Sequence, residues 1–221
     1  MYSRQSPSPR YETLIQQNRR LHLEGNPAQQ LGAQDVFPGK SLFRQLPRIR
    51  RLIQATGSAS LLDYGCGKGT QYQAPGFDLD GQAVNETGQD YLDVDYIYRY
   101  DAAYPPFTTL PGDRFDGVIC TDVLEHCPEE DLPWIVDELF GFARKFVFAN
   151  VACYPAAKLL PNGDNAHCTQ LDAAWWDALF RDAAGRHAGT AWQVWHVSRQ
   201  GAPGRFEYPE KQLGSMKMEE Q

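Results

Sequence analysis

The amino-acid sequence predicts an α/β fold: a doubly wound, mostly parallel sheet with an antiparallel C-terminal hairpin and helices on both faces. Two observations lead to this prediction. Short apolar runs typical of buried strands alternate with helix-like stretches between residues 58 and 199, and a glycine-rich turn directly follows the first of these runs. No segment of roughly 20–50 residues repeats along the chain, which excludes solenoids and propellers.

Two helices are expected ahead of the sheet, because apolar residues recur at loosely helical spacing over 11–23 and 41–55. Pro47 interrupts the second stretch. It either kinks that helix or marks the first turn of a shorter helix that begins near Leu46. The expected cap and stop of this stretch are Ser41 and Gly57.

Strands are expected where β-branched and aromatic residues cluster between turn signals. The predicted strands cover 60–64, 96–100, 115–120, 145–151 and 191–197, and predicted helices cover 129–143 and 172–184, the latter capped by Asp172. The helix between the third and fourth of these strands implies a right-handed parallel crossover. Residues 205–208 are expected to return across 201–204 as the antiparallel partner of the last strand.

The chain is expected to divide into four segments. These are a mobile head (1–10), an N-terminal helical lid or cap (11–57), the core (58–199), and an edge strand with a flexible tail (200–221).

Composition restricts the class of protein. A length of 221 residues allows one full α/β domain, and a mean hydropathy of −0.52 with no apolar run near ~20 residues excludes a membrane span. The formal charge of −7 argues against a nucleic-acid partner. Five cysteines without a C-x-x-C pair argue against a disulfide framework, and no apolar signal segment opens the chain, so a cytoplasmic location is expected.

The strand at 60–64 leads directly into glycines at 65, 67 and 69. Glycines at this place let a ligand approach the backbone closely, although a turn needed for structure alone would give the same pattern. The spacing D-x-G-x-G-x-G differs from the dinucleotide fingerprint G-x-G-x-x-G and resembles motif I of the class I S-adenosylmethionine-dependent methyltransferases. The resemblance implies a Rossmann-like fold with cofactor contacts from Asp63, Tyr64, Gly65, Cys66, Gly67 and Gly69.

In that family a second acid ends the next strand and binds the ribose hydroxyls of the cofactor, because a carboxylate can accept two hydrogen bonds from a vicinal diol. Asp101, followed by Ala102, ends a strand-like run but lies farther along the chain than usual. Asp78 or Asp80 ends another such run, yet too few residues separate it from the glycine loop for a crossover helix. We prefer Asp101 and interpret 73–95 as a long connection that carries an insertion.

The segment 115–126, F-D-G-V-I-C-T-D-V-L-E-H, resembles the fourth-strand segment of small-molecule methyltransferases. This resemblance implies cofactor contacts from Asp122, Val123 and Leu124 and a substrate contact from Glu125. His126 either packs beside the strand end, hydrogen bonded to backbone, or acts as a general base.

Polar residues gather at 159–167, L-L-P-N-G-D-N-A-H. The segment resembles the L-P-D-G-x-N-A-H loop of a group of bacterial methyltransferase-domain proteins, with Asn162 in place of the Asp. In such proteins this loop lies over the sulfonium of the cofactor, so His167 is the first candidate for a base or substrate ligand. The alternative is that His167 only stabilises the loop. Further candidate substrate contacts are Tyr154 and Asn165.

These resemblances cover roughly residues 36–197, including V-F-P-G-K-S-L at 36–42. They imply S-adenosylmethionine-dependent methyl transfer to a small-molecule or sugar/metabolite acceptor, by a monomer or homodimer without a metal. An oxygen acceptor would use His167 or His126 as base, whereas a nitrogen or thiolate acceptor needs none. The helix over 11–23 would be a lid over the cofactor or merely a cap on the sheet. Two alternatives are an inactive S-adenosylmethionine-binding or interaction domain and an RNA methyltransferase.

Overall fold

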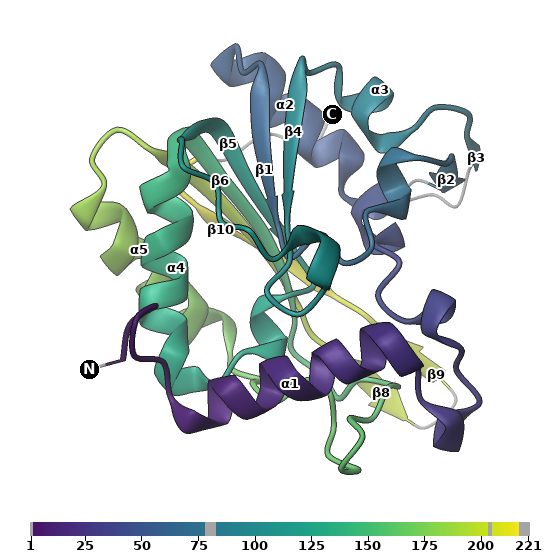
Figure 1. Ribbon diagram of the computed structural model, residues 1–221. Helices are drawn as coiled ribbons and strands as arrows, with labels where there is room; N and C mark the ends of the chain where they lie inside the picture. Colours follow the sequence, from purple (N-terminus) through teal and green to yellow (C-terminus); the bar gives the residue numbers. More distant parts are fainter. Residues whose placement is uncertain (1, 78–82, 203–204, 217–221) are drawn as a thin grey trace.

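Six strands form the central sheet in the order β10–β7–β6–β5–β1–β4 (Figure 1). The computed structural model describes residues 2–77, 83–202 and 205–216. All neighbouring strands run parallel except β10, which is antiparallel to β7. This confirms the predicted α/β class with a mostly parallel sheet. The strands are β1 (Ser60–Tyr64), β4 (Tyr96–Tyr100), β5 (Phe115–Thr121), β6 (Ala143–Ala152), β7 (Ala191–Val197) and β10 (Glu210–Gly214).

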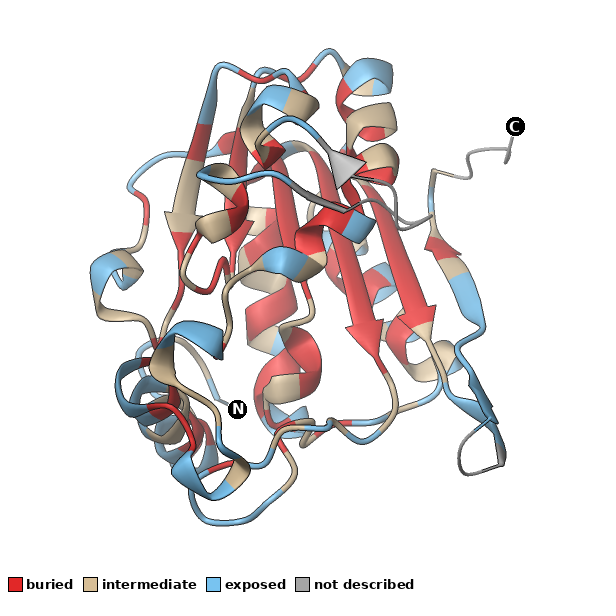
Figure 2. Cartoon of the chain, turned by 90° about the vertical axis from the view of Figure 1, so that its right-hand side faces the viewer, coloured by how far each residue is buried: buried red, intermediate tan, exposed pale blue. Residues whose placement is uncertain are grey.

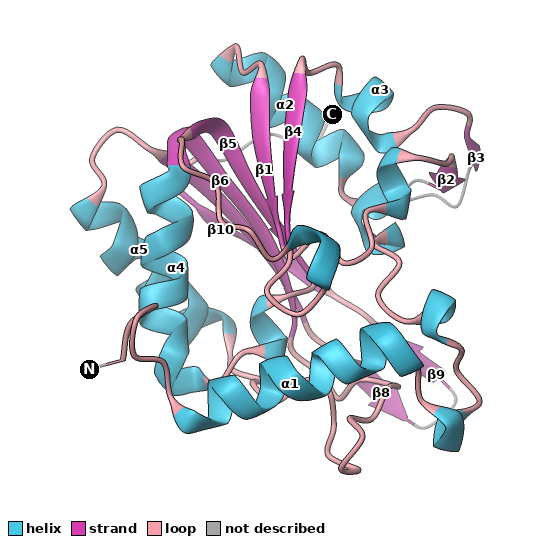
Figure 3. Cartoon of the chain, viewed as in Figure 1, coloured by secondary structure: helices cyan, strands magenta, loops and turns pink. Residues whose placement is uncertain are grey.

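Helices cover both faces of this sheet (Figure 3). One face packs against α2 (Leu46–Thr56) and α3 (Gly88–Leu92), and the other against α4 (Leu132–Phe142) and α5 (Ala173–Arg186). The longest helix, α1 (Pro9–Glu24), belongs to neither layer and lies at the end of the sheet where the parallel strands finish. Short 3-10 helices are η1 (Pro27–Gln29), η2 (Ala33–Asp35), η3 (Lys40–Arg44), η4 (Thr70–Tyr72), η5 (Pro105–Phe107), η6 (Leu124–His126) and η7 (Glu129–Asp131).

The central strands are buried along almost their whole length (Figure 2). Strands that are covered on both faces read as nearly continuous apolar runs, as β5 and β6 do in the sequence. The side chains of β5 and β6 therefore contribute to both apolar cores, for example Val118 on the α4 side and Ile119 on the α2 side.

The structure decides between the two alternatives for Pro47. Helix α2 starts at Leu46 with Pro47 in its first turn, where a missing N–H costs nothing, and the preceding residues form η3 instead of a longer α-helix. Gly57 ends α2 at a φ of 59°, as expected, whereas Ser41 lies inside η3 and does not cap α2. The predicted cap of α5 is confirmed, since the Asp172 side chain accepts a hydrogen bond from the Trp175 N–H.

The predicted hairpin partner of β7 was wrong. Residues 205–208 do not pair with β7; β9 (Arg205–Glu207) pairs with β8 (Gln200–Ala202) in a separate exposed hairpin. The antiparallel partner is β10, which lies within 200–221, where an edge strand and a flexible tail were expected without a position for the strand. Of the side chains of β10 only that of Leu213 is buried, so an edge strand with one core residue leaves little apolar pattern to detect.

The connection between β1 and β4 contains the expected insertion. It holds η4, a small antiparallel hairpin formed by β2 (Gly76–Phe77) and β3 (Ala83–Val84), and α3. Asp78 and Asp80, the alternative ribose ligands, lie outside the described residues.

The first residues are anchored in the structure, which differs from the mobile head that the sequence predicted. Arg4 forms an ion pair with Glu138 of α4, and the same guanidinium lies 4.8 Å from the centroid of the Trp134 ring. Ser8 caps α1, and its N–H and hydroxyl both donate to the Asp131 carboxylate. These buried polar partners are scattered across the chain, so composition alone did not reveal them. The division of the chain into lid and core stays a prediction.

Two expectations from composition can be compared with the structure. Within the described residues, no helix is long and apolar enough to cross a membrane. The five cysteines all fall in the described part of the chain, and each is a free thiol, as expected.

Candidate functional site

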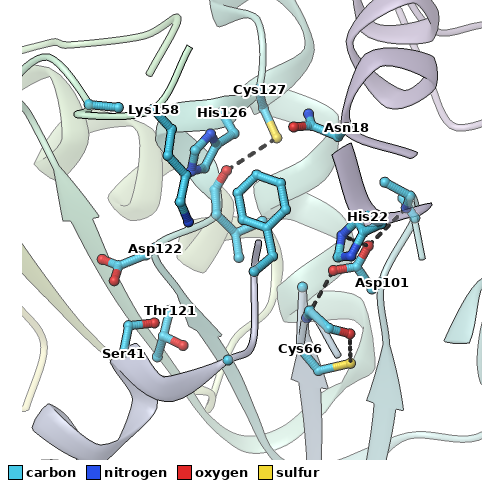
Figure 4. Close-up of a pocket in the computed structure, with 18 of the residues that line it drawn as sticks. Asn18, His22, Ser41, Cys66, Asp101, Thr121, Asp122, His126, Cys127 and Lys158 are labelled. Carbon is cyan, nitrogen blue, oxygen red and sulfur yellow. Dashed lines mark hydrogen bonds and ion pairs between the residues drawn. The ribbon is translucent and has the colours of Figure 1, made fainter. Parts of the chain in front are cut away.

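A cavity of about 580 Å³ lies at the carboxyl ends of the parallel strands, against α1 (Figure 4). Residues that follow β1, β4 and β5 form its floor, and α1, the segment 35–41 and the loop after β6 form its walls. A volume within ~300–1,000 Å³ is typical of small-molecule sites, and the carboxyl ends of the strands are where α/β sheets bind ligands.

Gly65 and Gly67 line this cavity in left-handed backbone conformations, with φ of 89° and 59°. A Cβ atom on Gly65 would lie 2.3 Å from Cγ2 of Val123, and one on Gly67 would lie 2.4 Å from the carbonyl oxygen of Phe37. Packing within the protein therefore already requires glycine at both positions, whether or not a ligand also requires it. Gly69 precedes η4 and does not line the cavity.

Asp101 links the end of β4 to the glycine loop. Its Oδ2 accepts a hydrogen bond from the Gly67 N–H (2.9 Å), and its Oδ1 accepts from the N–H groups of Ala103 (2.9 Å) and Tyr104 (3.0 Å). Burial raises the pKa of Asp101, and these three bonds oppose the shift. Because a carboxylate offers about four acceptor positions, Oδ2 has room for one hydroxyl, not for the two of a vicinal diol.

Asp63 lies beneath the loop and not in the cavity. It is 1% exposed, and its Oδ2 accepts hydrogen bonds from Gln71 Nε2 (3.1 Å) and the Tyr72 hydroxyl (2.7 Å). Burial raises the pKa of Asp63 to about 7. The structure thus gives Asp63 the task of holding η4 against β1, and it gives no direct path to a ligand.

Asp122, directly after β5, faces the cavity with a φ of 52°. This conformation is rare for a residue with a side chain and is found mostly where function constrains the backbone. The carboxylate accepts a hydrogen bond from Asn150 Nδ2, and burial raises the pKa of Asp122. Val123 follows and also lines the cavity.

The next two residues, Leu124 and Glu125, turn into the core as part of η6. Glu125 Oε1 accepts a hydrogen bond from the Ala152 N–H (2.9 Å), and Oε2 has no partner among the described residues. Burial raises the pKa of Glu125 well above its ordinary value. Neither residue lines the cavity, so the predicted contacts from Leu124 and Glu125 are not available in this structure.

His126 and His167 both line the cavity, with ring centroids 4.9 Å apart. In each ring Nδ1 meets a backbone carbonyl: the Ala166 oxygen at 2.8 Å for His126 and the Tyr154 oxygen at 2.6 Å for His167. A neutral imidazole that donates from Nδ1 keeps a lone pair at Nε2, which is the form that accepts a proton. Burial lowers the pKa of His126 to about 3 and lowers that of His167, so both rings are neutral at pH 7.

We expect the substitution His126→Asn to make the protein less sensitive to acid. An unfolded histidine titrates near 6.5 and this buried ring near 3, so between these values the unfolded state binds more protons. The stability is complete above the unfolded pKa and falls by up to ~1.4 kcal/mol per pH unit on acidification. Asparagine can still donate to the Ala166 carbonyl but does not titrate.

Urea denaturation at pH values above and below 6.5 measures this effect. The wild-type protein should lose more stability than the variant as the pH falls. Equal losses in the two proteins would contradict the assignment of a buried, neutral imidazole.

The structure thus sorts the predicted site residues into two groups. Those that line the cavity are Tyr64, Gly65, Cys66, Gly67, Asp101, Ala102, Asp122, Val123, His126, Tyr154 and His167. Those that support it from outside are Asp63, Gly69, Leu124, Glu125 and Asn165, the last of which bonds to Ala156 and to the His167 N–H. Within the described residues no three His, Cys, Asp or Glu side chains gather as a metal site would require.

Among the cavity residues that sequence reasoning missed are three polar ones, Asn18, His22 and Lys158 (Figure 4). The His22 ring is 4% exposed, its Nδ1 lies 3.2 Å from the Lys68 ammonium, and its Nε2 lies 3.8 Å from Asp101 Oδ1. Asn18 and His22 follow Tyr11 and Ile15 on one face of α1, so polar residues inside an apolar helical stripe were the available signal. No pattern marked Lys158.

Comparison of the chain with models of known protein families gave no match, and comparison with curated proteins gave none either. The motifs quoted above and the geometry of the cavity are therefore the basis on which a function can be proposed.

Proposed function

We propose that this protein is an S-adenosylmethionine-dependent methyltransferase that acts on a small molecule. The observation that carries the proposal is the position of the Gly65–Gly67 turn, Asp101 and Asp122. They lie together on one cavity, each following a different parallel strand. Carboxylates along such an edge favour a cationic ligand with hydroxyl groups.

The residues present fit this cofactor. Asp101 Oδ2 retains one acceptor position that a ribose hydroxyl would use, and the Asp122 carboxylate at the cavity would balance the charge of a sulfonium. Asn18 Oδ1 on the lid helix is buried and has no partner among the described residues, so it can accept a hydrogen bond from an amino or hydroxyl group of a ligand. The backbone of residues 64–67 lines the cavity, so the remaining part of the cofactor can approach it closely.

When bound, the cofactor supplies a methyl group whose bond to sulfur breaks, with its electron pair remaining on sulfur, as the acceptor atom bonds to carbon. The protein's own residues would align the acceptor and take its proton. His167 Nε2 is the better base, because His126 is more deeply buried and its pKa is lowered to about 3. Tyr154 and the His126 ring flank His167 and fix its orientation.

Calorimetric titration with S-adenosylmethionine and S-adenosylhomocysteine tests the proposal. The wild-type protein should bind both, and Asp101→Asn should weaken binding roughly ten- to hundredfold, because a hydrogen bond to a charged group contributes ~1.5–3 kcal/mol. Asp113→Asn, an exposed carboxylate outside the cavity, is the matched control, and thermal unfolding of each variant reports on folding.

Two outcomes would contradict parts of this proposal. A wild-type protein that binds neither compound is not a methyltransferase of this kind. Binding without methyl transfer to any compound of a metabolite panel would favour a cofactor-binding domain that has no transferase activity.

A further inference from the structure

Lys158 extends into the cavity from the loop after β6, on the side of His126 and Asp122 (Figure 4). Its ammonium lies 4.7 Å from the centroid of the Phe37 ring. The side chain is partly buried, and burial lowers the pKa of Lys158, a shift that the Asp122 charge opposes. The loop thus places a cation at the wall opposite the glycine turn.

Apart from the Phe37 ring, this cation has no direct partner in the described part of the chain. Lys158 makes no ion pair or hydrogen bond with the described residues, whereas Arg4, Arg48 and Lys145 each pair with a carboxylate. Cations that are removed from water are normally paired, because the cost of desolvating an unpaired charge is large. An open cavity leaves water around the ammonium, and a ligand that fills the cavity displaces this water.

The neighbouring carboxylates are already engaged. Asp122 accepts a hydrogen bond from Asn150, and Asp101 accepts three from backbone N–H groups. With a sulfonium in the cavity, Asp122 would also have that cation to balance. The two histidine rings beside Lys158 are neutral, so they add no negative charge.

We propose that Lys158 binds an oxyanion, a carboxylate or a phosphate, of the methyl acceptor, so that the acceptor is a small anionic molecule. This inference rests on the proposed function. The part of the cavity around Lys158 is lined by aromatic rings, with Phe37, His126, His167 and Tyr154 in successive contact at centroid distances of 5.7, 4.9 and 5.8 Å. A planar acceptor that packs along the cavity side of these rings would have its oxyanion at Lys158 and its hydroxyl at His167.

Benzoate, its neutral analogue benzamide and inorganic phosphate are suitable probes, added to the protein with and without S-adenosylhomocysteine and followed by calorimetry or by chemical-shift changes. Benzoate or phosphate should bind, and benzamide should bind roughly tenfold more weakly than benzoate or not at all. Which of the two anions binds tells a carboxylate acceptor from a phosphate acceptor.

Lys158→Met should remove anion binding, and Lys158→Arg should restore part of it. The control is Lys211→Met. Lys211 is an exposed lysine of β10 that does not line the cavity, so its replacement should leave binding unchanged. Thermal unfolding confirms that each variant is folded, and S-adenosylhomocysteine binding should persist in all of them.

Equal binding of benzoate and benzamide, or benzoate and phosphate binding that survives Lys158→Met, would overturn the oxyanion site. Absence of any anion binding to the wild-type protein in the presence of S-adenosylhomocysteine would overturn it too. The proposed function fails separately: anion binding that depends on Lys158, without binding of S-adenosylhomocysteine, would retain the oxyanion site and exclude methyl transfer.

Discussion

Replacing Gly67 with alanine should lower the free energy of unfolding by roughly 2–5 kcal/mol. A left-handed conformation costs an L-residue about 1–2 kcal/mol, and forcing extra volume into a packed site costs about 1–3 kcal/mol more. The added Cβ would lie 2.4 Å from the Phe37 carbonyl oxygen, which is itself bonded to the Lys68 N–H at 2.9 Å. Backbone lies on both sides of this contact, so neither side can move freely.

Gly57→Ala is the matched control. Gly57 has the same φ of 59°, but a Cβ there meets nothing within 4 Å. Its replacement should cost only the conformational part, about 1–2 kcal/mol. Urea denaturation of both variants isolates the steric contribution as the difference between them. Equal losses would show that Phe37 yields to the methyl group and that the loop is not tightly packed.

Replacing Arg4 with methionine should destabilise the protein by roughly 2–4 kcal/mol, somewhat less than the cost of breaking a fully buried pair. The side chains of Arg4 and Glu138 are 23% and 17% exposed. Arg4 also donates to the hydroxyls of Tyr64 and Tyr100, the last residues of β1 and β4. The substitution leaves Glu138 without its cation and detaches the segment that leads into α1.

Arg20→Met provides the comparison, because its ion pair with Glu24 has side chains that are 64% and 60% exposed. An exposed pair of this kind contributes about 0–1 kcal/mol, so this variant should be nearly as stable as the wild type. Limited proteolysis gives a second measurement: the Arg4 variant should be cut faster within α1. Similar stabilities and cleavage rates for the two variants would mean that the first residues do not hold α1 in place.

The sequence predicted the central parallel strands because they are buried on both faces. Apolar runs such as those of β5 and β6 are short, continuous and bounded by turns, and they leave few other interpretations. The predictions from the sequence failed near residues 1–10 and 205–214, where only a few residues contact the rest of the protein. Leu213 is the single buried side chain of β10, and the head is held by the polar contacts of Arg4 with Glu138 and of Ser8 with Asp131. One buried side chain produces no periodicity.

The candidate site was predicted where it follows strand ends and missed where it does not. The motif around 122–126 identified a segment that borders the cavity. Within this segment, however, some side chains face the cavity and others face the protein interior. Asp122 faces the cavity and Glu125, within η6, faces the Ala152 backbone. Sequence proximity cannot separate these directions. Lys158 sits in an irregular loop, and only the fold brings it to His126.

The pairing of Arg4 with Glu138 has a consequence for biosynthesis. The two residues are 134 positions apart, and β1, β4 and β5 lie between them, so Arg4 finds its partner only after half of the strands of the central sheet have been translated. At about 5–20 residues per second this delay amounts to roughly 7–27 s, in which the apolar face of α1 has no sheet to cover. Nascent chains arrested before Glu138 should therefore show a protease-sensitive α1, and full-length chains a protected one. The wall of the cavity that α1 forms is therefore translated well before it can assemble.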